Sequence, residues 1–163
     1  MNSKRLLTLV LLLALAGFPL HASMISFLVV ETGLVEGNNA GEYSTLWEDG
    51  LMGAFFEAGY IVSNGTIIRL EKSPSKIFPD EVEDDYYDAA AGGADYFVLA
   101  LLEYKNQNGK FVPSGISLRI FNIESTDLVY QQNFAAGTGK SLKEESAKAR
   151  DAGRAIIPHL KDR

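Results

Sequence analysis

The 163-residue chain contains no cysteine and only two histidines, His21 and His159. The lack of cysteine excludes disulfides, thiol nucleophiles and a lipid attached to an amino-terminal cysteine. Common zinc sites and Ser-His-Asp triads also need imidazole or thiolate groups, and His159 is the one such residue beyond position 22. The composition therefore predicts a domain held by its hydrophobic core alone, with no enzymatic activity and no cofactor.

Basic residues are also scarce, with 15 Lys and Arg against 21 Asp and Glu and a formal net charge of −6. Proteins that bind phosphates rely on clustered Lys and Arg, and the sequence shows no basic stripe. We therefore expect no nucleic acid partner, and no affinity for anionic lipid surfaces.

The first 22 residues have the pattern of a secretion signal. Lys4 and Arg5 precede an apolar run over residues 6–20, and the small residue Ala22 follows. The run contains a glycine and a proline and is shorter than the roughly 20 apolar residues of a membrane-spanning helix. We predict cleavage between Ala22 and Ser23.

Two regions follow from this interpretation: a signal peptide over 1–22 and a single α/β domain over 23–163. The processed domain is expected to be periplasmic and soluble, without stable membrane insertion. Secretion beyond the envelope, or an uncleaved signal that anchors the chain, are the alternatives.

The first half of the domain alternates strand and helix patterns. Residues 25–31 (ISFLVVE) form a β-branched run typical of a strand covered on both faces, and helical spacing follows over 43–58, ending at Gly59. A short strand is predicted at 60–63. Asn64-Gly65 could then start a hairpin with 66–70, but the prolines at 74 and 79 favour a loop.

In the second half, an acidic helix over 80–91 precedes the longest apolar run of the domain, 95–104 (DYFVLALLEY), which we predict to be the middle strand. The polar residues 105–115 are predicted to be an exposed loop. Residues 116–123 and 128–134 are expected to pair as an antiparallel hairpin. A final helix over 142–160 begins with a capping box.

These elements predict an α/β fold: a β-α-β-α-β core, then an antiparallel β-hairpin and a carboxyl-terminal helix. Right-handed crossovers would make the first three strands parallel. Helices would cover the sheet on one face or on both, giving two or three layers.

Three segments carry a resemblance to a known family. They are FLVVE in the first strand, Gly-Ala-Asp-Tyr at 93–96 leading into FVLALLEY, and the hairpin LRIFNIESTDLVYQQ. Their order resembles the amino-terminal domain of TolB and the related periplasmic domains of the curli secretion lipoprotein and of a lipoprotein activator of cell-wall synthases. The resemblance implies a non-enzymatic envelope domain that docks to an envelope or outer-membrane protein. The lipidation cysteine of those lipoproteins is absent here.

Residues 137–141 (GTGKS) end like a phosphate-binding P-loop. That motif needs a further glycine five positions before Gly139, so that backbone N–H groups can surround the phosphates, and Phe134 stands there. The signature fails, and we interpret the segment as a flexible glycine loop with Ser141 as the N-cap of the last helix.

Carboxylates crowd residues 80–88, but they lack the spacing and the glycine of a calcium loop. We interpret them as a solvated helix face, with Val82, Tyr86, Ala89 and Ala90 on its buried side, and expect no metal. A hydrolase using carboxylates alone would need two acids that face each other across a cleft.

A small ligand would bind beyond the carboxyl ends of the parallel strands. The polar residues expected there are Glu31, Thr32, Asn64, Glu103 and Tyr104. Two functions follow: a non-enzymatic docking module for an envelope protein, or a periplasmic protein that binds a small ligand with these residues. Ordinary strand-end chemistry also accounts for the five residues, because no cofactor fingerprint accompanies them.

Overall fold

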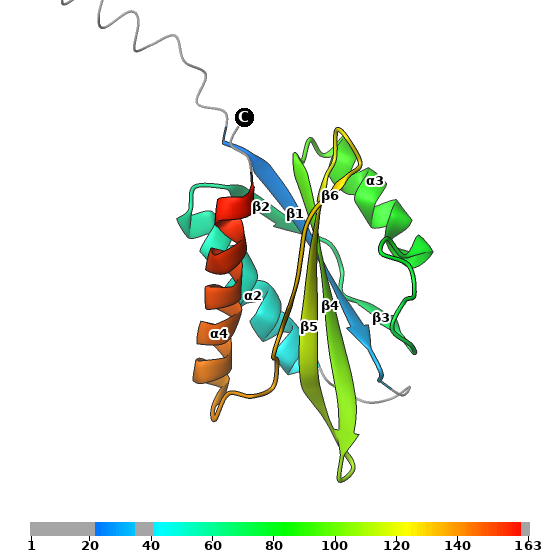
Figure 1. Ribbon diagram of the computed structural model, residues 1–163, viewed down its shortest axis with the longest axis vertical. Coiled ribbons are helices and arrows are strands. Elements are labelled where there is room, and N and C mark those ends of the chain that lie inside the picture. Colours follow the sequence, from blue (N-terminus) through cyan, green and yellow to red (C-terminus); the bar gives the residue numbers. More distant parts are fainter. Residues whose placement is uncertain (1–21, 35–40, 161–163) are drawn as a thin grey trace, which may run out of the picture.

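The computed structural model describes residues 22–34 and 41–160, which form an open, twisted α/β sheet (Figure 1). The sheet has the strand order β2-β1-β4-β5-β6, and β3 pairs with β1 beside β2. The strands are β1 (Met24–Thr32), β2 (Ile61–Asn64), β3 (Ile68–Leu70), β4 (Tyr96–Gln107), β5 (Lys110–Asn122) and β6 (Leu128–Phe134).

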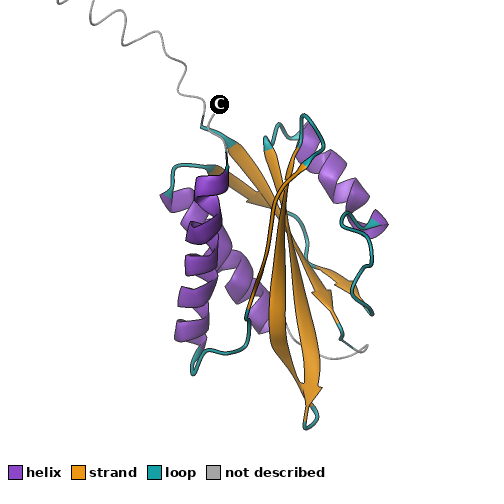
Figure 2. Ribbon diagram, in the orientation of Figure 1, coloured by secondary structure: helices purple, strands orange, loops and turns teal. Residues whose placement is uncertain are grey.

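Helices cover both faces of the sheet, so the fold has three layers (Figure 2). On one face lie α2 (Gly41–Glu57) and α4 (Leu142–Ile156), the latter followed by the 3-10 turn η2 (Ile157–His159). On the other lies α3 (Glu83–Ala91), which continues from the 3-10 turn η1 (Asp80–Val82). The predicted α/β class is confirmed, and each predicted helix is present.

The centre of the sheet is the parallel pair β1 and β4, in register from Ile25 opposite Tyr96 to Thr32 opposite Glu103. β2 also runs parallel to β1, as the predicted crossovers require. On the other side of β4, the strands β5 and β6 pair antiparallel. The apolar run at 95–104 is therefore the middle strand, as predicted.

At one edge of the sheet, the prediction of a loop over residues 66–70 is wrong. β3 is a strand, and it pairs in parallel with the end of β1, from Val30 opposite Ile68 to Thr32 opposite Leu70. The hairpin alternative is also wrong, because β2 and β3 both run parallel to β1. β1 has nine residues and β2 only four, so the chain returns after Gly65 to bond the remaining backbone groups of β1.

The predicted loop at 105–115 is wrong as well. β4 and β5 extend through it and meet at a two-residue turn, Asn108-Gly109, in which both residues have positive φ (52° and 83°). This hairpin runs past the ends of α2 and α4 (Figure 1), where neither face packs on a helix. Its outer part therefore carries polar residues, which made it look like a loop. The second hairpin, with its turn at 124–127, is confirmed.

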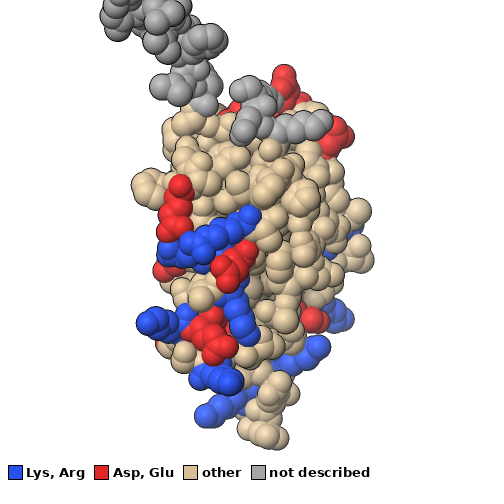
Figure 3. All heavy atoms as spheres, turned by 60° about the vertical axis from the view of Figure 1, so that its left-hand side comes forward, with Lys and Arg blue, Asp and Glu red and all other residues tan. Residues whose placement is uncertain are grey.

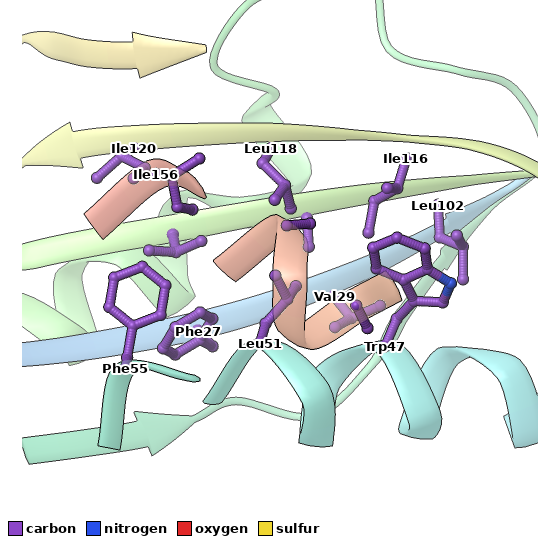
Figure 4. Close-up of a cluster of buried hydrophobic side chains, with 14 of the residues drawn as sticks. Phe27, Val29, Trp47, Leu51, Phe55, Leu102, Ile116, Leu118, Ile120 and Ile156 are labelled. Atoms are coloured by element: carbon purple, nitrogen blue, oxygen red, sulfur yellow. The ribbon is translucent and has the colours of Figure 1, made fainter. Parts of the chain in front are cut away.

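Alternate residues of the strands supply two cores. One lies under α2 and α4 and includes Trp47, Leu51, Phe55, Leu118 and Ile156 (Figure 4). The other lies under α3. Its buried residues include Leu28, Val30, Val82, Tyr86, Phe97 and Leu99. Because both faces of β1 are covered, its sequence shows an apolar run instead of alternation.

The helices α2 and α4 approach closely through two glycines. A Cβ atom added to Gly50 on α2 would lie 2.5 Å from the Cβ of Ala149, and one added to Gly153 on α4 would lie 2.7 Å from the Cβ of Ala54. On each helix, a glycine therefore faces an alanine of the other helix. The lack of a side chain at these two glycines allows the helices to pack closely.

The predicted signal segment lies outside the described residues except for Ala22, so its cleavage stays a prediction. Within residues 22–34 and 41–160, no helix has the length and the apolar character needed to cross a membrane.

Candidate functional site

The carboxyl end of β1 and the adjacent residues of β4, which itself continues to Gln107, bring together four of the five predicted site residues. Thr32 lies directly opposite Glu103, and Glu31 and Tyr104 are their neighbours along the two strands. Because successive side chains of a strand point to opposite faces, the four divide into two sites. Glu31 and Tyr104 face α2, whereas Thr32 and Glu103 face the other side of the sheet.

Glu31 is buried and fully engaged within the chain. Its Oε2 accepts hydrogen bonds from Nε and Nη2 of Arg69 on β3 (2.9 and 2.7 Å). Its Oε1 accepts from the hydroxyl of Ser44 on α2 (2.6 Å), and that hydroxyl lies 2.8 Å from the hydroxyl of Tyr104. Four elements are thus joined at one carboxylate. Sequence reasoning missed Ser44 and Arg69, because neither is near Glu31 along the chain.

The pKa of Tyr104 is raised far above its ordinary value, mainly because the phenol is buried. The hydrogen bond with Ser44 lowers this pKa in part, and the negative charge of Glu31 raises it further. Tyr104 is therefore a neutral phenol at physiological pH. This cluster is suited to holding β1, β3, β4 and α2 together, since its polar atoms already have partners.

Thr32 and Glu103 line a hollow of about 380 Å³ on the opposite face of the sheet. Its other polar walls come from Ser73, Ser117, Arg119, Gln131 and Asn133. The Thr32 and Ser73 hydroxyls lie 3.1 Å apart, and the Ser114 hydroxyl donates to the carbonyl of Glu103 (3.2 Å). Hydroxyl, amide and carboxylate groups together could hydrogen-bond a small polar ligand.

Arg119 fixes one wall of this hollow. Its Nη1 donates to the carbonyls of Lys76 and Ile77 (3.0 and 2.6 Å), which holds the loop before η1 against β5. Burial lowers the pKa of Arg119. Among the described side chains, Arg119 Nε and Ser117 Oγ are buried without a hydrogen-bond partner. Both atoms are covered, so a ligand in the hollow would reach them only after a local rearrangement.

Asn64 lies apart from the other four predicted residues. Asn64 is the last residue of β2, but β2 is short and β3 continues the edge beyond it, so Asn64 stands opposite Phe27 in the middle of β1 and not at the carboxyl end of β1. Its Nδ2 donates to Oε1 of Glu48 (3.1 Å). Burial raises the pKa of Glu48, and the bond from Asn64 lowers it in part. Ligand binding by any of the five residues stays a prediction.

The Gly-rich segment 137–141 is held by an acid of this same chain. Glu145 is buried, and its carboxylate accepts from the backbone N–H groups of Gly137 and Gly139 (2.6 and 2.8 Å). These are the groups that a phosphate-binding loop would need. The interpretation as a flexible loop is therefore corrected, because Glu145 fixes it. Ser141 is the N-cap of α4, as predicted, and accepts from the Glu144 N–H (3.2 Å).

The acids of residues 80–88 lie mostly in solvent on η1 and α3. Val82, Tyr86 and Ala89 are buried, as the predicted helix face requires, and Ala90 is half-buried. Asp85 is half-buried, and burial together with the charges of Asp88 and Asp84 raises its pKa. Asp85 and Asp88 line one shallow hollow, but both come from α3, so they do not face each other across it. No group of three or more His, Cys, Asp or Glu side chains among the described residues could hold a metal ion.

The outermost strand, β6, is the exposed edge of the predicted carboxyl-terminal hairpin. Its seven residues, LVYQQNF, include no charged residue and no proline, and the strand forms one edge of the sheet. Four of the seven are exposed, among them Val129 at 41%. Beside its first residue, the turn at 124–127 and α3 enclose a third hollow, which is lined largely by aromatic rings.

No protein-family model matches the chain, and no curated protein matches it. Among solved structures, the chain is similar to a PelC dodecamer from Paraburkholderia phytofirmans, with 11% identity and a TM-score of 0.48 over 87% of this chain and 90% of that one. It is also similar to TolB from Acinetobacter baumannii (15% identity, TM-score 0.40, 86% of this chain and 28% of that one). Lipoprotein GNA1162 from Neisseria meningitidis gives 14% identity and a TM-score of 0.40 over 86% of this chain and 100% of that one.

TolB and a lipoprotein are thus among the similar structures, and the resemblance that the sequence indicated is confirmed. The likeness is one of fold. At identities of 15% or less and TM-scores below 0.5, it carries no conclusion about activity, partner or compartment.

Proposed function

We propose that this chain is a non-enzymatic module of the cell envelope that docks to an envelope protein through the outer edge of β6. The observation that carries the proposal is the composition of that edge. Natural sheets protect their edges with lysines, prolines, bulges or very short strands. β6 has seven residues without a charge or a proline, and its one bulge lies at Val129 near its start, after which residues 130–134 pair with β5 without interruption. Such an edge is suited to pairing with an extended segment of another protein.

The opposite edge of the sheet differs from β6. β2 and β3 contribute four and three residues, separated by 65–67, and β3 carries Arg69. A long strand added there would meet a break in the row of backbone donors and acceptors. This contrast between the two edges supports β6 as the docking edge.

Crosslinking from single positions tests the proposal. A photoreactive amino acid is placed at Val129 or Gln131 of β6, in cells that naturally make the protein. The matched control position is Asp151 on α4, whose side chain is 73% exposed. We expect an adduct with one envelope protein from both β6 positions and none from Asp151. Equal adducts from all three positions, or none from β6, would contradict the proposal.

A charge on the edge should then prevent docking. Gln131→Lys adds the kind of residue that protects natural edges, so the adduct from Val129 should be lost. Ala155→Lys adds the same charge to an exposed position of α4 and should leave the adduct unchanged. An adduct that survives Gln131→Lys would mean that the contact at β6 is not strand pairing.

Export is part of the proposal, and it rests on the signal pattern of residues 1–22. Protein recovered from the periplasmic fraction should begin at Ser23 when its amino terminus is sequenced. A chain that begins at Met1 and stays with the cytoplasmic fraction would contradict the proposed location.

A second candidate function is the binding of a small ligand in the hollow that contains Thr32 and Glu103. The observation in its favour is that both predicted residues line one hollow with Arg119. A ligand that binds only the folded state raises the melting temperature. We would expect a compound from a panel of envelope metabolites to do so for the natural protein, but not for Thr32→Val. A panel without any shift would leave docking as the one function proposed.

A further inference from the structure

The aromatic hollow beside β6 has an unusual lining. Its volume is about 310 Å³, and its walls are Phe78, Glu83, Tyr86, Tyr87, Phe121 and Thr126. Four of these six side chains are aromatic and one is a carboxylate. The hollow lies between α3, β5 and the turn that leads into β6.

The aromatic walls support one another. The ring of Phe78 packs edge-on against Tyr86 and Phe121, with centroid distances of 5.2 and 5.1 Å, and Tyr86 packs against Phe97 in the same way. Tyr87 is 59% exposed, and its hydroxyl donates to Oε1 of Glu83 (3.2 Å). The lining is therefore preformed and apolar at its base, with a carboxylate at its rim. Pockets of this kind take an apolar anchor of a partner.

The surroundings of the hollow are strongly negative. Residues 76–88 include six carboxylates and one lysine, Lys76, which pairs with Asp80 (2.6 Å). The turn that carries Thr126 adds Glu124 and Asp127. The outer face of α2 and α4 is different, because acidic and basic side chains alternate on it (Figure 3) and Arg154 pairs with Glu57 and Asp151. A partner at the hollow would gain from positive charge, whereas a partner on α4 would not.

We propose that the hollow receives an apolar side chain of the docking partner that is flanked in sequence by Lys or Arg. The inference rests on the proposed docking at β6, because the two surfaces are continuous. Leu128, the first residue of β6, packs against the same apolar cluster that contains Phe121 and Tyr86. A segment paired along β6 would therefore reach the hollow at the end nearest the turn.

Three acetylated and amidated tetrapeptides serve as probes. Each has Leu-Phe at its centre, flanked on both sides by lysine, by serine or by glutamate. Their binding is followed by the shifts of backbone amide signals in two-dimensional NMR of the domain. We expect the lysine peptide to move the signals of residues 78–87 and 121–126. Its apparent affinity should exceed that of the glutamate peptide by about tenfold, because two favourable charge contacts replace two repulsive ones.

Salt and two substitutions sharpen this test. In about 1 M salt, where charges are screened beyond about 3 Å, the difference between the lysine and glutamate peptides should largely disappear. Tyr87→Ala and Glu83→Gln should each weaken binding of the lysine peptide several-fold. Phe56→Ala, a matched control at an exposed aromatic residue (70%) on α2, should leave it unchanged. Signal dispersion in each spectrum shows whether the variant is folded.

Equal binding of the three peptides, or shifts confined to other surfaces, would overturn the inference. Its failure can be told apart from failure of the proposed function. Adducts at β6 without peptide binding at the hollow would leave docking in place and reject this partner chemistry. Peptide binding without adducts at β6 would show a basic, apolar ligand preference and reject docking along the edge.

Discussion

The indole Nε1 of Trp47 on α2 donates a hydrogen bond of 3.0 Å to Oε1 of Glu145 on α4, and both side chains are almost completely buried. The same carboxylate accepts from the backbone N–H groups of Gly137 and Gly139. One acid thus joins two helices to the loop that precedes α4. Three neutral donors surround its two oxygens, and removing the carboxylate would leave all three without a partner.

Glu145→Ala should therefore lower the free energy of unfolding by about 3 kcal/mol, since buried unsatisfied donors are costly. Glu145→Gln keeps one acceptor oxygen and should cost less. Trp47 is the sole tryptophan, so its fluorescence during urea unfolding reports the change directly. The control is Glu144→Ala, at an exposed neighbour, with a loss of about 1 kcal/mol or less. A Glu145→Ala variant as stable as the natural protein would contradict this account of the loop.

The close approach of α2 and α4 predicts that Gly50→Ala is destabilising, although alanine favours helix. The new Cβ would lie 2.5 Å from the Cβ of Ala149, and such overpacking costs about 1–3 kcal/mol. Gly53→Ala is the control on the same helix, because its nearest new contact is the flexible end of Arg150 at 3.2 Å. It should be neutral or slightly stabilising. Thermal unfolding measures both, and Ala149→Gly should restore part of the loss in the Gly50→Ala background.

Arg69→Met should destabilise the domain by about 2 kcal/mol, because Glu31 would remain buried without its cation. The matched control is Arg154→Met, which removes exposed pairs with Glu57 and Asp151 and should cost less than about 0.5 kcal/mol. Urea unfolding of the two variants gives the comparison. Equal losses would mean that the cluster around Glu31 contributes no more than a surface ion pair.

Glu48→Gln should stabilise the domain at pH 7. Burial raises the pKa of Glu48 in the folded state above its ordinary value of 4.5, so ionisation begins to favour the unfolded state once the pH exceeds 4.5 and does so in full above the folded pKa. The gain should be complete above that pKa, shrink as the pH falls through it, and vanish below pH 4.5. Stability curves over pH 3.5–7.5 measure the gain, with Glu42→Gln at an exposed site of α2 as control. A gain that does not depend on pH would point to packing instead of ionisation.

The sequence predicted the central elements of the fold because they are buried on both faces. Residues 25–31 and 95–104 are nearly continuous apolar runs, and that pattern is distinctive. The outer parts of β4 and β5 were missed for the opposite reason: they extend beyond the helices, so polar residues are tolerated there. Asn108-Gly109 is a hairpin signal, but it lay within a stretch interpreted as a loop. β3 has only three residues and depends on its pairing with β1, which local pattern does not reveal.

The candidate sites were predictable in part. The approach of these residues of β1 and β4 followed from parallel topology, and strand alternation could have separated Glu31 from Thr32 and Glu103 from Tyr104. The register of the two strands was needed to place Glu31 and Tyr104 on the same face. Asn64 was misplaced because β3 was not expected to continue its edge. The role of Glu145 had no local signal, because an acid in the first turn of a helix is usually exposed. Trp47, which helps to bury it, lies 98 residues away along the chain.

The interruption at 65–67 limits how far these sheets can grow by adding strands. A partner that pairs with β6 occupies the longer edge, and the edge that stays exposed on this domain is the interrupted one of β2 and β3. Propagation into a fibre needs two long edges on every subunit, and the described residues supply one, β6. Complexes formed through β6 should therefore be finite. Once a partner occupies β6, folded domains should no longer add to one another through this edge.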